Sequence, residues 1–425
     1  MYNTVLTSLA FILFSLFCQL IHAAQVLDIY KASVPVESQE SQYRVEGFDN
    51  AFQQVLIKAS GRILLVTDPG TFQALLPSEA YVQTFSYREN PLYKAYLLQQ
   101  ALMQQELANV PVNPLSDFPK NQNEELLEDI PAVGSAHVES KLNENKQIQR
   151  VPLPYVLDVS FAPSLVQDKM TDLNIPVLGD VRPSILLWLV FESEGERSIL
   201  GTSDTSDLIP AINKFSKEFA VPVFLPVADL IDVNSIDIDD VWGLYPETVI
   251  DASKRYQPGA IVMIRINELD EGSWNGSWYL ELKELEAFGQ STKATKSEVI
   301  GDLFKALAKS LSEKYSVSPS MANQASFLEV EVGNINNFRD YVGLQEYVSN
   351  LSPVQSIQIN KVQGTKVFLR LTLLGSAKQF FEHIDLGGKI KRVTDPEFDF
   401  ETNKAFDTFL TEQLVWLSNS PVLIN

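Results

Sequence analysis

Cysteine is almost missing from this chain of 425 residues, since Cys18 is its one cysteine. Cys18 lies in the N-terminal segment that we interpret below as a signal peptide. The mature chain would then contain no disulfide, no thiolate nucleophile and no metal site with cysteine ligands. Stability must therefore come from packing.

Histidine is nearly as scarce, with three residues in the whole chain. Only His137 and His383 lie beyond the N-terminal segment. His137 stands in a stretch without periodicity, and His383 fits a polar position on a short helix. A histidine-based metal site or a Ser-His-Asp triad needs partners that converge on a rigid frame. We therefore predict no metal and no cofactor.

Basic residues are too few to balance the acidic ones, and the formal net charge is −21. Residues 326–393, with eight Lys or Arg against six Asp or Glu, are the one slightly basic segment. Nucleic-acid binding draws most of its affinity from Lys and Arg that neutralise phosphates. We predict no nucleic-acid partner, and the same acidity disfavours strong binding to an anionic membrane.

The first 24 residues contain no Lys, Arg, Asp or Glu. Residues 5–17 form a mostly apolar run that is shorter than the roughly 20 residues needed to cross a bilayer. This pattern is typical of a secretory signal peptide cut after Ala24, and it predicts an exported, periplasmic protein. If the signal is not cleaved, it would instead anchor the N-terminus in the membrane.

Residues 25–108 predict a small α/β domain. Apolar spacing favours strands at 26–36 and 80–90, and helices at 41–60, 68–76 and 92–107. From 109 to 150 the periodicity disappears, and polar and acidic residues alternate with prolines. Such a segment cannot bury enough apolar area to offset its ordering entropy, so we interpret it as a flexible acidic linker or insertion.

Residues 151–318 alternate strand and helix patterns. Continuous apolar runs at 185–191 and 260–264 suit strands that are covered on both faces. We predict a mixed, mostly parallel α/β domain that ends in an antiparallel β-hairpin. Asn275-Gly276 is a favoured two-residue turn for that hairpin, and it would place Trp274 and Trp278 on opposite faces.

Residues 319–395 follow a different order, βαββαβ, which predicts a ferredoxin-like domain. On its second and third strands Phe368 is the one outward-facing aromatic residue, too few for an RNA-stacking surface. Residues 396–425 would add a C-terminal tail with an amphipathic helix at 402–417. The fold class is therefore α/β and α+β in a chain of several modules.

Five stretches resemble a known family: SGR at 60–62, RPSILLWLVF at 182–191, VPVFLPVADL at 221–230, DVWGLYPETVIDASKRYQPGAIVMIRI at 240–266 and SWNGSWYL at 273–280. In this order they resemble the Gram-negative bacterial envelope proteins catalogued as domain of unknown function 2066 (DUF2066). The resemblance covers residues 25–393 without 92–150. It implies an exported, periplasmic protein and supplies no catalytic residues.

No motif in the chain carries a recognisable catalytic chemistry. The acidic run DVNSIDIDD at 232–240 lacks the glycine that a calcium loop needs at its sixth position, so we interpret it as a loop that caps the next helix. LGGKIK at 386–391 lacks the spacing of a phosphate-binding loop. Catalysis is therefore not predicted, although paired carboxylates can be recognised only in three dimensions.

We predict a non-catalytic envelope protein that acts as a binding or scaffold module for another periplasmic or membrane component. The partner would be an envelope protein, and the candidate binding residues are Trp242, Trp274 and Trp278. The alternative is a glycan-binding protein or carbohydrate-active enzyme that uses paired carboxylates near these tryptophans. A flat apolar patch would favour the first function, and a deep acidic cleft beside the tryptophans would favour the second.

Overall fold

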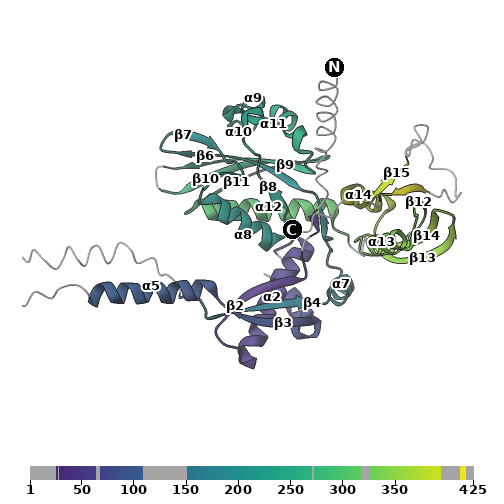
Figure 1. Ribbon diagram of the computed structural model, residues 1–425, viewed down its shortest axis with the longest axis horizontal. Helices are drawn as coiled ribbons and strands as arrows, with labels where there is room; N and C mark the ends of the chain where they lie inside the picture. Colours follow the sequence, from purple (N-terminus) through teal and green to yellow (C-terminus); the bar gives the residue numbers. More distant parts are fainter. Residues whose placement is uncertain are drawn as a thin grey trace, which may run out of the picture. The chain divides into compact units, whose positions relative to one another are not determined.

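The computed structural model describes residues 25–26, 28–63, 68–108, 151–269, 272–317, 326–393 and 412–417. Within these ranges the chain has a mixed α/β structure (Figure 1). The described residues form two compact units, of which the smaller takes its residues from 33–51 and 82–160 and the larger takes the others. The predicted signal peptide and the segment 109–150 lie outside the described residues.

The N-terminal elements follow the predicted order. They are β1 (Gln25–Val26), β2 (Lys31–Val36), α2 (Ser41–Ser60), α4 (Pro69–Leu75), the 3-10 helix η1 (Ser78–Tyr81), β3 (Val82–Glu89) and α5 (Pro91–Ala108). The side chain of Asp68 caps α4 by accepting the backbone N–H of Thr71. β2 and β3 flank β4 (Tyr155–Phe161), which is the central strand of their sheet. The predicted place of β4, in the middle region, is therefore wrong, because strands usually pair with their neighbours in sequence but β4 pairs with two strands from the N-terminal region.

The middle region forms a six-stranded mixed sheet. Its elements are α7 (Pro163–Asp172), β5 (Val181–Arg182), β6 (Ile185–Ser193), β7 (Glu196–Ile199), α8 (Leu208–Phe219), β8 (Val223–Phe224), α9 (Leu230–Ser235), α10 (Ile238–Trp242), α11 (Pro246–Ser253), η2 (Lys254–Tyr256), β9 (Ala260–Glu268), β10 (Trp274–Leu282), β11 (Leu285–Lys293) and α12 (Lys296–Tyr315). The strand order is β11-β10-β9-β6-β7, with β8 beside β6, and β1 pairs separately with β5.

The predicted mixed sheet is confirmed, but the prediction that it is mostly parallel is wrong. β6 runs parallel to β8 and β9, whereas β6–β7, β9–β10 and β10–β11 are antiparallel. The antiparallel pairs are consecutive in sequence and joined by short connections, which parallel pairs do not allow.

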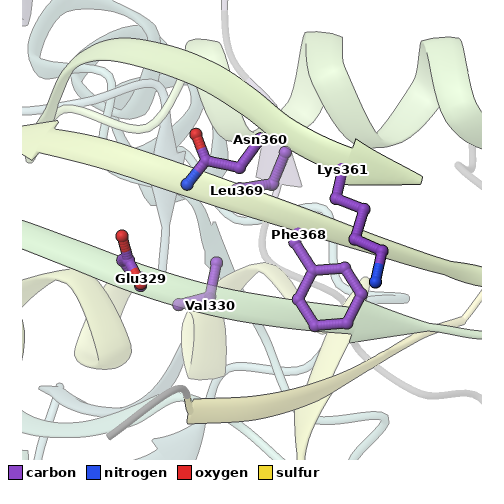
Figure 2. Close-up of a pocket in the computed structure, with 6 residues that line it drawn as sticks. All are labelled: Glu329, Val330, Asn360, Lys361, Phe368 and Leu369. Atoms are coloured by element: carbon purple, nitrogen blue, oxygen red, sulfur yellow. The ribbon is translucent and has the colours of Figure 1, made fainter. Parts of the chain in front are cut away.

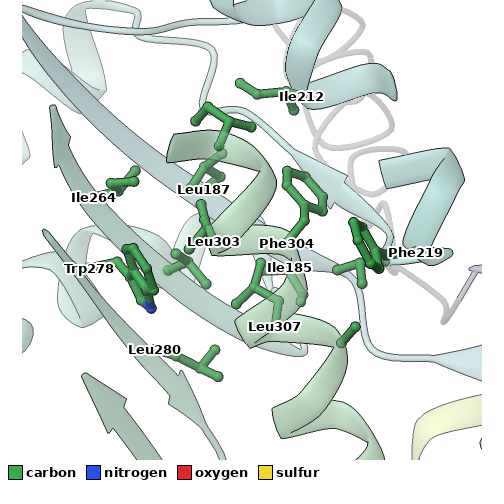
Figure 3. Packing of buried hydrophobic residues seen from close by; sticks show 14 of the residues in the cluster. Ile185, Leu187, Ile212, Phe219, Ile264, Trp278, Leu280, Leu303, Phe304 and Leu307 are labelled. Atoms are coloured by element: carbon green, nitrogen blue, oxygen red, sulfur yellow. The ribbon is translucent and has the colours of Figure 1, made fainter. Parts of the chain in front are cut away.

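Helices cover both faces of this sheet, with α8 and α12 on one side and α10 and α11 on the other (Figure 1). Ile185 and Leu187 of β6 pack against α8 and α12 (Figure 3). Leu186 and Trp188, which point to the other face of β6, belong to the core on the α10 and α11 side. The predicted burial of the apolar runs on both faces is confirmed.

The predicted turn at Asn275-Gly276 is wrong. β9 ends at Glu268 and β10 begins at Trp274, so that Gly276 lies within a strand and pairs with Ile266. A Cβ atom on Gly276 would lie 2.2 Å from Cγ1 of Val299 in α12, and glycine therefore serves close helix packing here. Trp274 and Trp278 consequently share the face that α12 covers, which corrects the prediction that they face opposite ways.

The C-terminal elements are β12 (Ser326–Gly333), α13 (Phe338–Ser349), β13 (Val354–Gln363), β14 (Lys366–Leu373), α14 (Ala377–Gly387), β15 (Ile390–Arg392) and β16 (Glu412–Trp416). The first six follow the predicted order, and the strand order is β13-β14-β12-β16-β15. α13 and α14 share an apolar core with one face of the sheet.

β16 corrects the prediction of a helix at 402–417, whose residues 402–411 lie outside the described ranges. β16 pairs in parallel with β12 and antiparallel with β15. The side chains of Leu414 and Trp416, two positions apart on β16, both point inward and are 2% and 6% exposed. A short apolar run fits a helix and a strand equally well in sequence, and here pairing with two strands decides.

None of the helices in the described ranges combines the length and apolar character needed to cross a bilayer.

Candidate functional site

The structure does not bring the three candidate tryptophans together. Trp278 is 6% exposed and packs between β10 and α12 (Figure 3). Trp274 is half-buried, and Nζ of Lys296 lies 4.7 Å from the centroid of its ring. Trp242 belongs to the core on the other side of the sheet. Ligand or partner binding by these residues stays a prediction.

Trp242 is half-buried at the end of α10 beside two arginines. The guanidinium carbons of Arg197 and Arg265 lie 4.1 and 5.9 Å from the centroid of its ring. Arg197 also forms an ion pair with Asp239, at 2.9 Å between Nη1 and Oδ1. Cation–π contacts of this kind occupy the aromatic surface that a sugar ring would use for stacking.

The acidic run at 232–240 caps α10, as predicted, but it is not a loop, because residues 232–235 lie in α9 and residues 238–240 lie in α10. Asp237 and Asp240 form a capping box at the start of α10. The side chain of Asp237 accepts the backbone N–H of Asp240, and the side chain of Asp240 accepts the backbone N–H of Asp237. No group of three His, Cys, Asp or Glu side chains in the described part of the chain is arranged to hold a metal ion.

His383 is a buried core residue on α14, 2% exposed. Its Nδ1 lies 2.8 Å from the carbonyl oxygen of Gln379, and the ring of Tyr315 meets it edge-on at 6.1 Å. Burial lowers the pKa of His383, so the ring is neutral at pH 7. His137 lies outside the described residues.

A hollow of about 190 Å³ lies on the C-terminal sheet, at an irregularity in the pairing of β13 with β14 (Figure 2). Its lining consists of Glu329, Val330, Asn360, Lys361, Phe368 and Leu369. Glu329 is already paired with Arg370 at 2.7 Å, and Nζ of Lys361 lies 5.7 Å from the centroid of Phe368. The hollow is smaller than the roughly 300 Å³ of ordinary ligand pockets.

Four exposed aliphatic side chains lie close together in the larger unit, on and beside α9. Val227, Leu230, Ile231 and Val233, here termed the α9 patch, are 47%, 79%, 59% and 65% exposed. Single exposed apolar residues are common, but four within seven positions on and beside one short helix form a local patch. Such patches mark interaction surfaces.

Asp232 holds α9 in place from the inside. It is 2% exposed, and its Oδ2 accepts the Tyr256 hydroxyl at 2.5 Å and the Ala228 backbone N–H at 2.9 Å. Its Oδ1 accepts Nη1 of Arg255 at 2.9 Å. The Tyr256 oxygen in turn accepts the backbone N–H of Val227 at 2.9 Å. Within α9, Asp232 therefore faces inward, whereas the aliphatic side chains of Leu230, Ile231 and Val233 face solvent.

Asp229 fixes the start of the same helix. Its side chain accepts the backbone N–H groups of Ile231 and Asp232, and Arg255 contacts both of its oxygens, at 2.8 and 3.0 Å. The hydrogen bond from Arg255 holds the pKa of Asp229 well below its usual range. Burial, followed by the bond to Asp232, raises the pKa of Tyr256 to about 12. Arg255 thus offsets one of the two carboxylate charges beside the patch, and the side chains that form the patch itself are aliphatic.

The α9 patch was not predicted from the sequence. In ADLIDVNS, Leu230, Ile231 and Val233 are residues that normally face a core, and Asp232 is one that normally faces solvent. The partners that reverse this arrangement, Arg255 and Tyr256, follow 23 and 24 residues later in the chain. Asp229 before an apolar run was the one local signal, and it indicates only a helix start.

Comparison with known families gives one partial match. Residues 23–111 match a family model described as domain of unknown function (DUF8605). The predicted resemblance to DUF2066 is therefore wrong, because the matching family is a different one. Much of that resemblance rested on β6 and β9, whose apolar sequences are typical of any strand covered on both faces. Among curated proteins, nothing matches the chain.

Proposed function

We propose that this chain is a non-catalytic, exported protein of the cell envelope that binds another envelope protein through the α9 patch. The observation that carries the proposal is the exposure of four aliphatic side chains on a segment fixed by buried hydrogen bonds and ion pairs. The export part of the proposal rests on the apolar, uncharged N-terminal 24 residues.

A rigid patch favours binding, because little conformational freedom is lost when the partner docks. Leu230 and Ile231 are the natural anchors, since they lead the helix and are 79% and 59% exposed. Truncation of two central aliphatic anchors typically costs about 1–3 kcal/mol of binding, or roughly tenfold to a hundredfold in affinity. A patch of this size would be the centre of a larger interface or a weak contact by itself.

Site-specific photo-crosslinking in intact cells tests the proposal. A photo-reactive amino acid is placed singly at Leu230, Ile231 or Val233, and for comparison at Lys217, an exposed residue of α8 on the other face of the sheet. We expect one discrete protein adduct from the three α9 positions and none from Lys217. Adducts that are absent from α9, or equal at Lys217, would contradict the proposal.

The carbohydrate alternative receives no specific support among the described residues. Trp278 is buried, and cationic side chains lie beside the rings of Trp242 and Trp274. We therefore do not propose glycan binding or glycoside hydrolysis.

We also propose that the C-terminal elements are a variant of the ferredoxin-like fold. The order β12-α13-β13-β14-α14-β15 and the adjacency β13-β14-β12 support this assignment. The variation is β16, which separates β12 from β15.

A further inference from the structure

Strand β11 forms one edge of the six-stranded sheet, and among the described strands it pairs with β10 alone. Its nine residues pair with β10 in an unbroken register. Outside that pairing, the backbone of β11 makes no hydrogen bond to another backbone group in the described ranges. The N–H and C=O groups on its outer side are therefore available along the whole strand, and another strand can pair with them.

The other edge strands of the six- and five-stranded sheets are short or irregular. β7, β8 and β15 have four, two and three residues, and the pairing of β13 with β14 contains two register shifts. Short strands, bulges and prolines are common means of protecting a sheet edge from pairing. β11 is neither short nor bulged, and it contains no proline.

One face of β11 is covered and the other is open. Leu285 and Ala287 are partly buried against the core that contains α12. Phe288 points to the opposite face and is 72% exposed. The centroid of its ring lies 4.8 Å from that of Tyr279 on β10. A strand added beside β11 would cover more of Phe288 with one of its own side chains.

The open face also carries two carboxylates. Glu281 of β10 and Glu286 of β11 lie directly opposite each other, next to the pair formed by Tyr279 and Phe288. The Tyr279 hydroxyl donates a hydrogen bond to Glu281. Neither glutamate forms an ion pair with a side chain in the described part of the chain. Like charges directly opposite each other destabilise a sheet, so a cation beside them would be stabilising.

We propose that β11 pairs with an extended basic segment of another protein, which adds a strand to the six-stranded sheet. Main-chain hydrogen bonds to the outer side of β11 hold the segment, and side chains of the segment provide the selectivity. Cβ atoms of residues directly opposite in neighbouring strands lie about 4.5–5.5 Å apart. A Lys or Arg opposite Glu286 therefore reaches its carboxylate, and one opposite Phe288 reaches the face of the ring.

Charge selects a basic segment rather than a second copy of this chain. A net charge of −21 repels whole copies from one another, and a second β11 would bring another Glu286 to the same edge. The same field attracts a basic segment, which supplies the cations that Glu281 and Glu286 lack. This inference does not rest on the proposed function of the α9 patch, because β11 and α9 share no residue.

Titration calorimetry of the full-length chain with designed peptides tests the proposal. The probe is a peptide as long as β11, with blocked ends, in which lysine alternates with valine. One comparison peptide has glutamate in place of each lysine, and another keeps the lysines but is N-methylated at every residue. We expect both comparison peptides to bind at least about tenfold more weakly than the probe, because one lacks the charge and the other lacks the main-chain donors. An N-methylated peptide that binds as well as the probe would overturn strand pairing.

A matched pair of variants separates β11 from the general attraction of an acidic protein. The double variant Glu281→Gln, Glu286→Gln should weaken binding of the probe about tenfold or more. The control is Glu194→Gln with Glu196→Gln, which removes two charges from exposed positions at the other edge of the sheet and should leave binding within about twofold. The β10–β11 variant should melt no lower than the unaltered chain, because it removes a repulsion. Equal weakening by the two double variants would overturn the proposal.

Hydrogen exchange locates the bound probe. We expect the lysine peptide to slow exchange of the backbone amides of β11 and to leave those of β7 unchanged, because only the amides that gain a partner strand are protected. A probe that does not bind, or that binds without protecting β11, would overturn the proposal. Neither result bears on the α9 patch, which the probe does not contact.

Discussion

Arg182 is a guanidinium group with no exposed surface, and its hydrogen-bond partners are backbone carbonyls. It donates to Gly179 at 3.0 Å, to Phe219 at 3.1 Å, to Ala220 at 2.6 Å and to Lys58. Phe219 and Ala220 end α8, and Lys58 lies in the last turn of α2, so the cation sits at the negative ends of two helices. Burial lowers the pKa of Arg182 to about 10, and the group remains charged at neutral pH.

Replacement of Arg182 should be among the most destabilising single changes in this chain. We expect Arg182→Met to lower the free energy of unfolding by about 3–5 kcal/mol, because buried carbonyls at two helix ends lose their donor. Urea denaturation measures the effect. Arg182→Lys retains the charge but has one nitrogen. Its free energy of unfolding should therefore lie between those of the unaltered chain and the methionine variant. A loss below about 1 kcal/mol in the methionine variant would refute this role.

His383 should make stability depend on pH. Burial, the largest influence, lowers the pKa of His383 in the folded chain below its ordinary value of 6.5, and the nearby charges of Glu382 and Lys283 act in opposite directions. As pH falls through about 6.5 the unfolded chain binds a proton that the folded chain resists. The contribution of neutral His383 to the free energy of unfolding is therefore fully present above pH 7. It decreases toward pH 5, by at most about 1.4 kcal/mol per pH unit.

The variant His383→Gln provides the control for this pH effect. Its glutamine cannot titrate, so the difference in unfolding free energy between the two proteins should shrink as pH falls from 7.5 to 5.5. Parallel stability profiles over this range would show that His383 does not titrate differently on folding.

At the scale of single elements, local spacing predicted most helices and strands. Residues such as Phe48, Phe52 and Leu56, at helical spacing, indicated α2, and the apolar run from Ile185 indicated β6. These signals are local, because side-chain period and capping act within a few residues. The pairing of β4 between β2 and β3, and of β16 beside β12, depends on residues far away in the chain and was not predictable in this way.

The α9 patch could not be predicted from local sequence either, because the residues that hold Asp232 inward lie far away in the chain, in η2. The prediction of a turn at Asn275-Gly276 was wrong because this glycine is required for helix packing, although the sequence is a favoured one for a turn. Glycine at this point admits α12, a tertiary requirement that resembles a turn signal when only the sequence is read.

Gly276→Ala tests that explanation. We expect a loss of about 1–3 kcal/mol in unfolding free energy, because the added Cβ meets Val299 at 2.2 Å and α12 must move. Gly70→Ala is the matched control: it lies in the first turn of α4, and its nearest neighbour for a Cβ, Oδ2 of Asp68, is 3.8 Å away. Chemical denaturation should find this control unchanged or slightly more stable. Equal losses in both variants would contradict the packing argument.

At the scale of the whole molecule, the large negative charge and the aliphatic α9 patch belong together. Net charge keeps copies apart and discourages nonspecific contacts, so specific contacts need surfaces where charge is absent or paired. The α9 patch, in the larger unit, comes near this condition because Arg255 pairs with both Asp229 and Asp232, so that only one net negative charge lies beside it.

The central claim is that the α9 patch holds an envelope protein, and quantitative affinity capture from gently crosslinked, solubilised envelopes tests it most directly. Four proteins are compared: the unaltered chain, Leu230→Ser with Ile231→Ser, Leu165→Ser, and Trp274→Ala. Leu165, on α7, is 49% exposed and serves as the matched leucine outside the patch. We predict that one envelope protein is enriched by the unaltered chain, the Leu165 variant and the Trp274 variant, and falls about tenfold or more with the α9 variant. Equal recovery of that protein with the α9 variant, or its loss with Trp274→Ala alone, would contradict the account.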